Sequence, residues 1–239
     1  MGWKYQLLGL MFYLIAPLIL VGQNPKIDIN SFNEISLETG TSDHILKLRN
    51  GTNWPIRLQV PDKLENAPLI IALHWAGDNQ TYKVFMECLA KPGFAELNAL
   101  IVAPSAEGQL WWEESMFYQV LELIDLINDN WAFDHSKVVV TGYSNGGTGA
   151  WAFAGLHPEY FSAAIAIAGS YAEIPSLKIP TYVIHSTNDE LFDYSYSKKY
   201  VSKFQPYSSF HSTSLSHYDA CNYTPLLKKA GRWLIDEVW

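Results

Sequence analysis

The chain has 239 residues, of which 49% are hydrophobic and 17% are charged, and its formal net charge is −8. This balance is typical of one globular domain with a packed core, and it excludes a disordered chain or a coiled coil. The acidic charge argues against nucleic acid as a partner, because no cluster of Lys and Arg is present to bind phosphates. A neutral small molecule fits such a chain better.

The N-terminal segment has the pattern of an export signal. Residues 7–21 are apolar except for Gly9 and Pro17, Lys4 precedes them, and polar residues follow at 23–24. The run is shorter than a membrane helix usually needs, so we predict a signal peptide over residues 1–22 and a periplasmic or extracellular protein. The alternative is an uncleaved N-terminal anchor, which would be the protein's contact with a membrane.

The domain itself is predicted to span residues 34–239 and to begin with antiparallel edge strands. Apolar and polar residues alternate in three short segments, and turn residues such as Asn50 and Gly51 separate them. The predicted edge strands are residues 35–39, 44–49 and 56–61. A polar connector, residues 23–33, precedes them.

The pattern changes after residue 68 to short, continuous apolar runs, which are typical of strands covered by helices on both faces. These runs are residues 69–74, 100–103, 138–141, 163–168 and 182–185, with a last strand at 208–215. Helical spacing lies between or after them, in residues 116–130, 145–156, 191–204 and 225–238. The alternation predicts an α/β fold: a mostly parallel central sheet, helices on both faces, an antiparallel N-terminal edge and no large cap domain.

The two cysteines, Cys88 and Cys221, form an even pair in a chain that we expect to be exported. An oxidising compartment permits a disulfide between them but does not require it. Two buried thiols are the alternative, and the sequence does not give the separation that would decide.

The strongest chemical signal is the motif GYSNGG at residues 142–147, which directly follows an apolar strand and precedes a helical stretch. A serine on a sharp strand-to-helix turn needs small neighbours, and the glycines provide them. The start of the following helix offers free N–H groups beside the hydroxyl. We therefore predict Ser144 as a nucleophile; the alternative is a glycine-rich turn without chemistry.

A serine needs a base to take its proton, and seven histidines are available. His217 follows the last strand in a polar loop, where its side chain can lean over the edge of the sheet. His74 and His185 end buried strands, where backbone hydrogen bonds are the more ordinary role. We predict His217 as the general base.

The base in turn needs a carboxylate, which holds the imidazole in the correct tautomer. Asp189 follows the strand over 182–185, and the order Ser144, Asp189, His217 is the one found in α/β-hydrolases. Asp193 is the alternative acid. Asp189 could instead be the N-cap of the helix that follows.

Ligands of parallel α/β sheets bind beyond the carboxyl ends of the strands. The backbone N–H groups of Ala76 and Asn145 lie there and are predicted to form an oxyanion hole. The predicted substrate-binding side chains are Trp75, Trp111, Trp112 and Tyr143; for the tandem tryptophans, packing beneath a loop is the alternative. No metal or organic cofactor is expected.

These residues give the chain a resemblance to the α/β-hydrolase superfamily, in particular to small esterases of the phospholipase/carboxylesterase, dienelactone-hydrolase-like and polyhydroxybutyrate-depolymerase-like types. The resemblance covers residues 68–238 and implies the same three reacting groups, Ser144, Asp189 and His217. The chain departs from these families where glycine is usual, with Trp75, Ser186 and Ser216 in its place.

The sequence thus predicts a serine hydrolase that cleaves carboxylic esters through an acyl-enzyme. Since little chain is left for a cap, we expect small-acid or carbohydrate esters. A serine peptidase of the same fold and an inactive hydrolase-fold binding protein are the alternatives. The sequence leaves the oligomeric state open.

Overall fold

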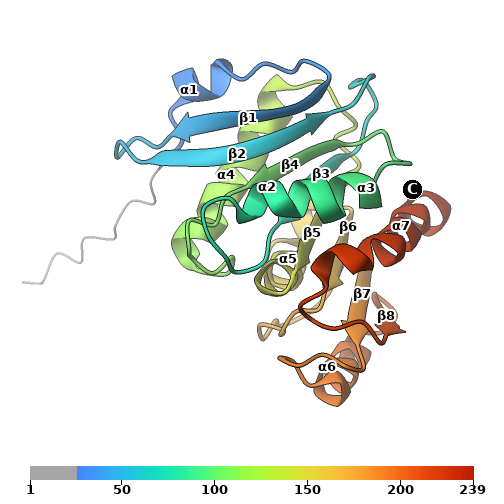
Figure 1. Cartoon of the computed structure of the whole chain (residues 1–239). Helices are drawn as coiled ribbons and strands as arrows, with labels where there is room; N and C mark the ends of the chain where they lie inside the picture. Colours follow the sequence, from blue (N-terminus) through green and yellow to red (C-terminus); the bar gives the residue numbers. More distant parts are fainter. Residues whose placement is uncertain (1–25) are drawn as a thin grey trace, which may run out of the picture.

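The computed structural model describes residues 26–239. One eight-stranded sheet forms the centre of this part of the chain, with the strand order β1-β2-β4-β3-β5-β6-β7-β8 (Figure 1). The strands are β1 (Gly40–Lys47), β2 (Asn53–Val60), β3 (Leu69–Leu73), β4 (Leu100–Pro104), β5 (Val138–Tyr143), β6 (Ala163–Ile167), β7 (Thr181–Ser186) and β8 (Ser208–Thr213).

The sheet is parallel except at its N-terminal edge. β1 pairs with β2 and β2 pairs with β4 in antiparallel fashion, while all pairs from β4 to β8 are parallel. This confirms the predicted mostly parallel sheet with its antiparallel edge. Because parallel strands end on the same side, the loops after β3, β5, β7 and β8 meet at one rim of the sheet.

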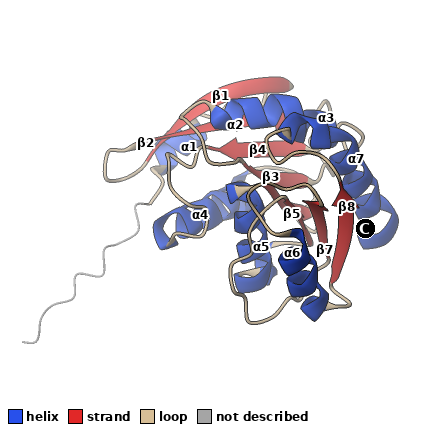
Figure 2. Cartoon of the chain, turned by 60° about the horizontal axis from the view of Figure 1, so that its bottom comes forward, coloured by secondary structure: helices blue, strands red, loops and turns tan. Residues whose placement is uncertain are grey.

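Helices cover both faces, as the continuous apolar strands predict. Leu69, Ile71 and Leu73 of β3 pack into the same core as α4 and α5, whereas Ile70 and Ala72 pack toward α2 and α7. Figure 2 shows these two layers on opposite sides of the sheet. The helices are α1 (Ile29–Asn33), α2 (Thr81–Phe85), α3 (Lys91–Gly93), α4 (Glu114–Asn130), α5 (Asn145–Leu156), α6 (Tyr194–Val201) and α7 (Thr224–Trp233). Within residues 26–239 no cap domain interrupts this arrangement.

The structure corrects the prediction at the N-terminal edge. Residues 35–39 form no strand: Ile35 and Leu37 pack against the core, which explains their alternation, but no neighbouring strand pairs with them. The polar connector contains α1, which the side chain of Asp28 caps. Phe32 anchors α1 by stacking on Trp131 at 5.1 Å between ring centroids.

The segment between β3 and β4 was also not predicted as helical. Its helices α2 and α3 have five and three residues, and a π-helical turn, Met86–Ala90, joins them. Pieces this short show no complete amphipathic period, so the sequence pattern cannot identify them.

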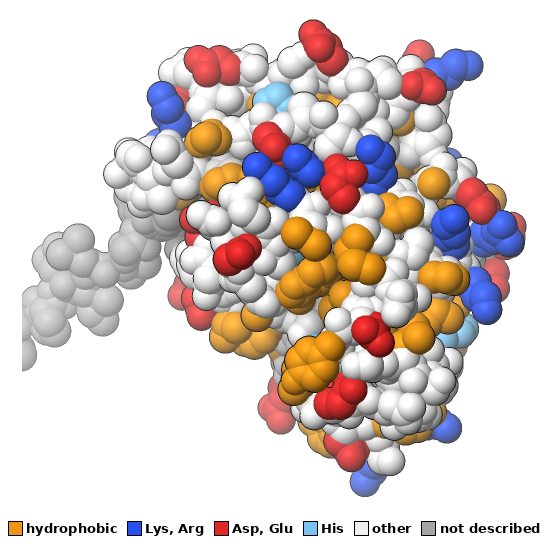
Figure 3. All heavy atoms as spheres, viewed as in Figure 1, with side chains coloured by type: hydrophobic (Ala, Val, Ile, Leu, Met, Phe, Trp, Pro, Cys, Tyr) orange, Lys and Arg blue, Asp and Glu red, His pale blue; other side chains and the backbone are white. Residues whose placement is uncertain are grey.

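The predicted signal peptide, residues 1–22, lies outside the described residues, which are the part of the chain that Figure 3 colours by side-chain type. Among residues 26–239, no helix is both long enough and apolar enough to span a lipid bilayer.

Cys88 and Cys221 form a disulfide, which decides the question that the sequence left open. The bond joins the π-helical turn Met86–Ala90 to the segment after β8, across 133 residues of chain. A cross-link over so long a loop restricts the unfolded chain strongly.

Replacing both cysteines with serine is therefore expected to lower the free energy of unfolding by about 2–4 kcal/mol. Urea unfolding monitored by circular dichroism measures this change. Dithiothreitol should destabilise the wild type by a similar amount and leave the double variant unchanged. Equal stability of the wild type and the double variant would show that the cross-link contributes nothing.

Candidate active site

Ser144 lies on the sharp turn between β5 and α5. Its backbone has φ 56° and ψ −115°, a conformation that non-glycine residues rarely adopt. The neighbouring glycines allow the turn: a Cβ on Gly146 would overlap the carbonyl oxygen of Leu73, and a Cβ on Gly147 would overlap that of Ile167. The turn thus holds the Ser144 hydroxyl at the rim of the sheet.

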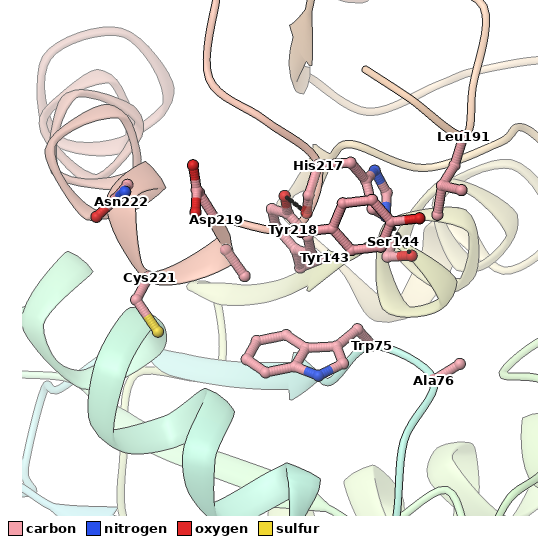
Figure 4. Close-up of a pocket in the computed structure, with 11 residues that line it drawn as sticks. Trp75, Ala76, Tyr143, Ser144, Leu191, His217, Tyr218, Asp219, Cys221 and Asn222 are labelled. Carbon is pink, nitrogen blue, oxygen red and sulfur yellow. Dashed lines mark hydrogen bonds between the residues drawn. The ribbon is translucent and has the colours of Figure 1, made fainter. Parts of the chain in front are cut away.

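Three side chains from distant parts of the sequence form a hydrogen-bonded chain at this rim. His217 Nε2 lies 3.0 Å from Ser144 Oγ, and His217 Nδ1 lies 3.0 Å from Asp189 Oδ2. Figure 4 shows the imidazole beside the serine hydroxyl. Since an ionised carboxylate only accepts hydrogen bonds, Nδ1 carries the proton that Asp189 accepts, and neutral Nε2 can accept from the serine.

Asp189 is held as an anion in a dry position. Its side chain is fully buried, which opposes ionisation, but His217 and the backbone N–H groups of Phe192 and Leu191 donate hydrogen bonds to it. These bonds outweigh burial, so the pKa of Asp189 lies below its usual value. Asp193, the alternative acid, instead caps α6.

The two strand-ending histidines have other surroundings. His74 Nδ1 donates to the carbonyl of Trp75 at 2.6 Å and Nε2 accepts from the N–H of Ala106 at 2.9 Å. Burial lowers the pKa of His74 to about 4, so it is neutral and fixes the loop after β3. His185 Nε2 lies 3.7 Å from Asp189 Oδ2, but burial lowers the pKa of His185 and the contact is not an ion pair.

The loop that carries His217 is held by side chains. Tyr143 donates its hydroxyl to the carbonyl of His217 at 2.7 Å. Glu190, the neighbour of Asp189, accepts from the backbone N–H of His217 and from the Ser216 hydroxyl, each at 2.7 Å. Ser216, one of the positions where the chain departs from the esterases that it resembles in sequence, thus has a partner in this chain.

Two N–H groups face no partner near Ser144. Within the described part of the chain, the backbone nitrogens of Ala76 and Asn145 donate no hydrogen bond. Asn145 is the first residue of α5, where free N–H groups and the positive end of the helix dipole favour negative charge. The structure therefore leaves both predicted donors available to a ligand.

A pocket of about 480 Å³ opens beside Ser144, a size within the roughly 300–1,000 Å³ usual for small-molecule sites. It includes three of the predicted residues other than the reacting groups, Trp75, Ala76 and Tyr143. Its full lining is Trp75, Ala76, Tyr143, Ser144, Leu191, His217, Tyr218, Asp219, Ala220, Cys221 and Asn222.

Trp111 and Trp112 do not line this pocket, so the prediction for them is wrong here. The Trp111 side chain is 0% exposed because its indole N–H donates to the carbonyl of His74 and its ring packs edge-on against that histidine. Trp112 is partly exposed but lies outside the lining. The alternative reading, packing beneath a loop, holds for Trp111.

The chain also matches known proteins. Residues 106–232, more than half of the sequence, match the profile of the prolyl oligopeptidase family, and this range contains Ser144, Asp189 and His217. The chain belongs to the prolyl oligopeptidase family. As a member of this family it is a serine hydrolase of the α/β-hydrolase superfamily. No curated protein sequence matches it significantly.

Solved structures similar to this prolyl oligopeptidase family member include a thermostable esterase (22% identity, TM-score 0.64, 82% of this chain and 62% of that one). Two Staphylococcus aureus proteins are also similar. The fluorophosphonate-binding serine hydrolase F has 14% identity and a TM-score of 0.69, covering 84% of this chain and 100% of its own. S-formylglutathione hydrolase has 14% identity and a TM-score of 0.65, with the same coverages. At these identities the likeness establishes the fold.

The sequence analysis did not predict the part of the pocket that Leu191 and residues 218–222 form. Their one signal was position, since they follow Asp189 or His217 within five residues. Among residues 26–239, no group of three or more His, Cys, Asp and Glu side chains is arranged to hold a metal ion.

The contacts of Glu190 predict a specific effect on the His217 loop. In Glu190→Gln, one carboxylate oxygen becomes an NH₂ group, which cannot accept from the His217 N–H or the Ser216 hydroxyl. We expect kcat for an ester to fall about tenfold with little change in KM, because a displaced base costs rate more than binding. Steady-state kinetics and thermal melting of both proteins measure this.

The matched control is Glu87→Gln, which removes a surface carboxylate that pairs with Arg57 and should leave kcat unchanged.

Hydrogen bonds from Ser216 and the His217 N–H lower the pKa of Glu190. The contribution of Glu190 to the stability of the folded protein is therefore fully present above the pKa of a glutamate in the unfolded chain. It is lost as the pH falls through the lowered pKa of the folded protein. A variant with normal kcat and only a lower melting temperature would contradict the role in positioning.

Proposed function

We propose that this serine hydrolase cleaves carboxylic esters with Ser144 as nucleophile, His217 as general base and Asp189 as the acid of the triad. The observation that carries the proposal is the pair of 3.0 Å contacts that link Ser144 Oγ to His217 Nε2 and His217 Nδ1 to Asp189 Oδ2. The match to the prolyl oligopeptidase family supports it.

In the first step, Ser144 Oγ bonds to the carbonyl carbon of the ester while its proton passes to His217 Nε2. The C–O bond to the leaving group then breaks, and the alcohol leaves with the proton from His217. In the second step, a water gives its proton to His217 and attacks the acyl-enzyme. Breaking the bond to Ser144 releases the acid and returns the proton to the serine.

The negative charge that forms on the carbonyl oxygen needs donors that are already in place. The free backbone N–H groups of Ala76 and Asn145 supply them in this proposal, and the start of α5 adds its dipole. Asp189, kept ionised by its own hydrogen bonds, stabilises the imidazolium of His217 in both steps.

Ester cleavage is favoured over peptide cleavage by the shape of the site. The pocket is open, no cap domain covers it within the described residues, and its lining contains no Lys or Arg for the carboxylate of a short peptide. Small-acid or carbohydrate esters suit it better than long lipids. The family name makes a peptidase the second candidate, because ester and amide cleavage share the same intermediates.

A substrate panel tests this choice. We expect p-nitrophenyl acetate and butyrate to be hydrolysed with higher kcat/KM than the decanoate, and dipeptide p-nitroanilides to be cleaved at least 100-fold less well. The Ser144→Ala variant measures background hydrolysis. Anilide turnover equal to ester turnover would favour the peptidase.

We also propose that the protein is exported to the periplasm or the extracellular space and acts there on a small-molecule ester. The Cys88–Cys221 disulfide supports this location, because such bonds persist in oxidising compartments. The intact mass of the protein recovered from the host's periplasm or medium would show whether residues 1–22 are removed. Recovery only from the reducing cytoplasm would contradict the proposal.

A further inference from the structure

The pocket has two ends. Ser144, Ala76 and Leu191 lie at one end, and Asp219, Cys221 and Asn222 lie at the other, on the opposite side of the view in Figure 4. The reacting carbonyl must lie at the Ser144 end. A part of the substrate remote from that carbonyl therefore meets the residues at the far end.

Aromatic side chains border the space between the two ends. The Trp75 indole lies along the bottom of the pocket in Figure 4, from Ala76 toward Cys221, and Tyr218 lies across from it. The rings of Phe85 and Tyr143 lie perpendicular to the indole at 5.7 and 5.9 Å, which fixes its orientation. Tyr218 is 71% exposed and sits next to His217. These aromatic surfaces suit a saturated ring whose faces carry C–H groups.

The far end is polar and has one charged group. Asp219 is the only charged residue of the lining apart from the ionisable His217, and the Asn222 amide lies three residues further along the chain. Both residues are exposed, and neither side chain has a hydrogen-bond partner among the described residues, so both are free to meet a ligand. A carboxylate accepts and an amide both donates and accepts, so together they match neighbouring hydroxyl groups.

We infer that the far end of this pocket binds the pyranose ring of a sugar, so that the substrates are sugar esters of small acids. The inference rests on the proposed ester hydrolysis. The ring's C–H face packs on Trp75, its hydroxyl groups bond to Asp219 and Asn222, and the ester-bearing carbon extends to Ser144.

The lining argues against two other occupants. An acyl chain offers no hydrogen bond to the Asp219 carboxylate or the Asn222 amide, and wherever it covered them it would take away their water. A quaternary ammonium ester could use Trp75 and Asp219 but would leave the Asn222 N–H groups unused. Hydroxyl groups engage both side chains.

The test compares two acetate esters, methyl 6-O-acetyl-glucopyranoside and ethyl acetate, which has no ring. We expect kcat/KM to be at least about tenfold higher for the sugar ester in the wild type. Asp219→Ala and Asn222→Ala should each lower the ratio of the two kcat/KM values about tenfold, mainly by raising KM for the sugar ester. Asp129→Asn, a surface carboxylate on α4, is the control and should leave the ratio unchanged.

Acetylcholine and phenyl acetate complete the panel. If Asp219→Ala and Asn222→Ala leave the ratio of the two kcat/KM values unchanged, the sugar subsite is overturned while ester hydrolysis stands. The same holds if the wild type prefers acetylcholine or phenyl acetate to the sugar ester. Turnover of none of the four acetates by folded protein would instead overturn the proposed function itself. Tryptophan fluorescence can measure binding of methyl glucopyranoside to Ser144→Ala without any turnover. Binding that is lost in Asp219→Ala supports the subsite independently.

Discussion

Replacing His217 with alanine is expected to lower kcat for p-nitrophenyl acetate by about 10⁴- to 10⁶-fold, because the Ser144 hydroxyl then has no base to take its proton. KM should change little. The side chain is almost fully buried at the rim and contacts Ser144 and Asp189, so its removal affects the reacting groups directly. Initial rates of the wild type and of His217→Ala, each corrected for hydrolysis without enzyme, measure the loss.

Two controls accompany this variant. His44→Ala removes a half-buried histidine of β1 whose hydrogen-bond partner is Ser42, and it should keep kcat within about twofold of the wild type. The double variant Ser144→Ala/His217→Ala should be no slower than either single variant, since the two residues act as a unit. More than about 1% residual kcat in folded His217→Ala would contradict its role as the base.

The second large effect is structural. Gly146→Ala is expected to lower the free energy of unfolding by at least about 3 kcal/mol, because the added methyl group would overlap the carbonyl oxygen of Leu73. That oxygen belongs to the backbone of β3, which cannot rotate away as a side chain would. The turn that holds Ser144 and the central strand must then separate.

Gly231→Ala is the matched comparison, a glycine-to-alanine change inside helix α7. Its Cβ would meet the nearest atoms at 3.6 Å, an ordinary contact, so the higher helix propensity of alanine should raise stability by about 0.5–1 kcal/mol. Thermal and urea unfolding of both variants measure the contrast. Equal stability of Gly146→Ala and the wild type would show that the turn is not constrained as the structure indicates.

The central sheet could be predicted because its strands carry their signal locally. Residues 69–73 and 138–143 are buried on both faces, and the glycines around Ser144 form a short motif that the sequence displays, although two of them are required by the backbone of Leu73 and Ile167. α5 begins and ends at the predicted residues. These features depend on periodicity and on one sharp turn, both of which a single sequence displays.

Features that depend on tertiary packing could not be predicted. Ile35 and Leu37 alternate as a strand does, but the absence of a partner strand decides their structure. The sequence favoured Asp189 over Asp193, but the two are only four residues apart, and it is the packing that brings one to His217 and leaves the other to cap α6. Trp111 is buried by a contact with the carbonyl of His74, which no local pattern reveals.

The candidate site likewise has a part that local sequence predicts and a part that depends on tertiary packing. Ser144, Asp189 and His217 were predicted from their positions after strands, and the structure brings their side chains together. The far end of the pocket, with Asp219 and Asn222, arises from how the segment after His217 packs. Glu190 acquires its role only because the loop after β8 returns to it.

Labelling with a fluorophosphonate probe, followed by peptide mass mapping, tests the assignment of Ser144 and His217 most directly. The proposed chemistry predicts one adduct per folded molecule, on Ser144, absent in Ser144→Ala and formed at least about 1,000-fold more slowly in His217→Ala. An adduct on another residue, or no adduct on a folded chain with its disulfide intact, would contradict it.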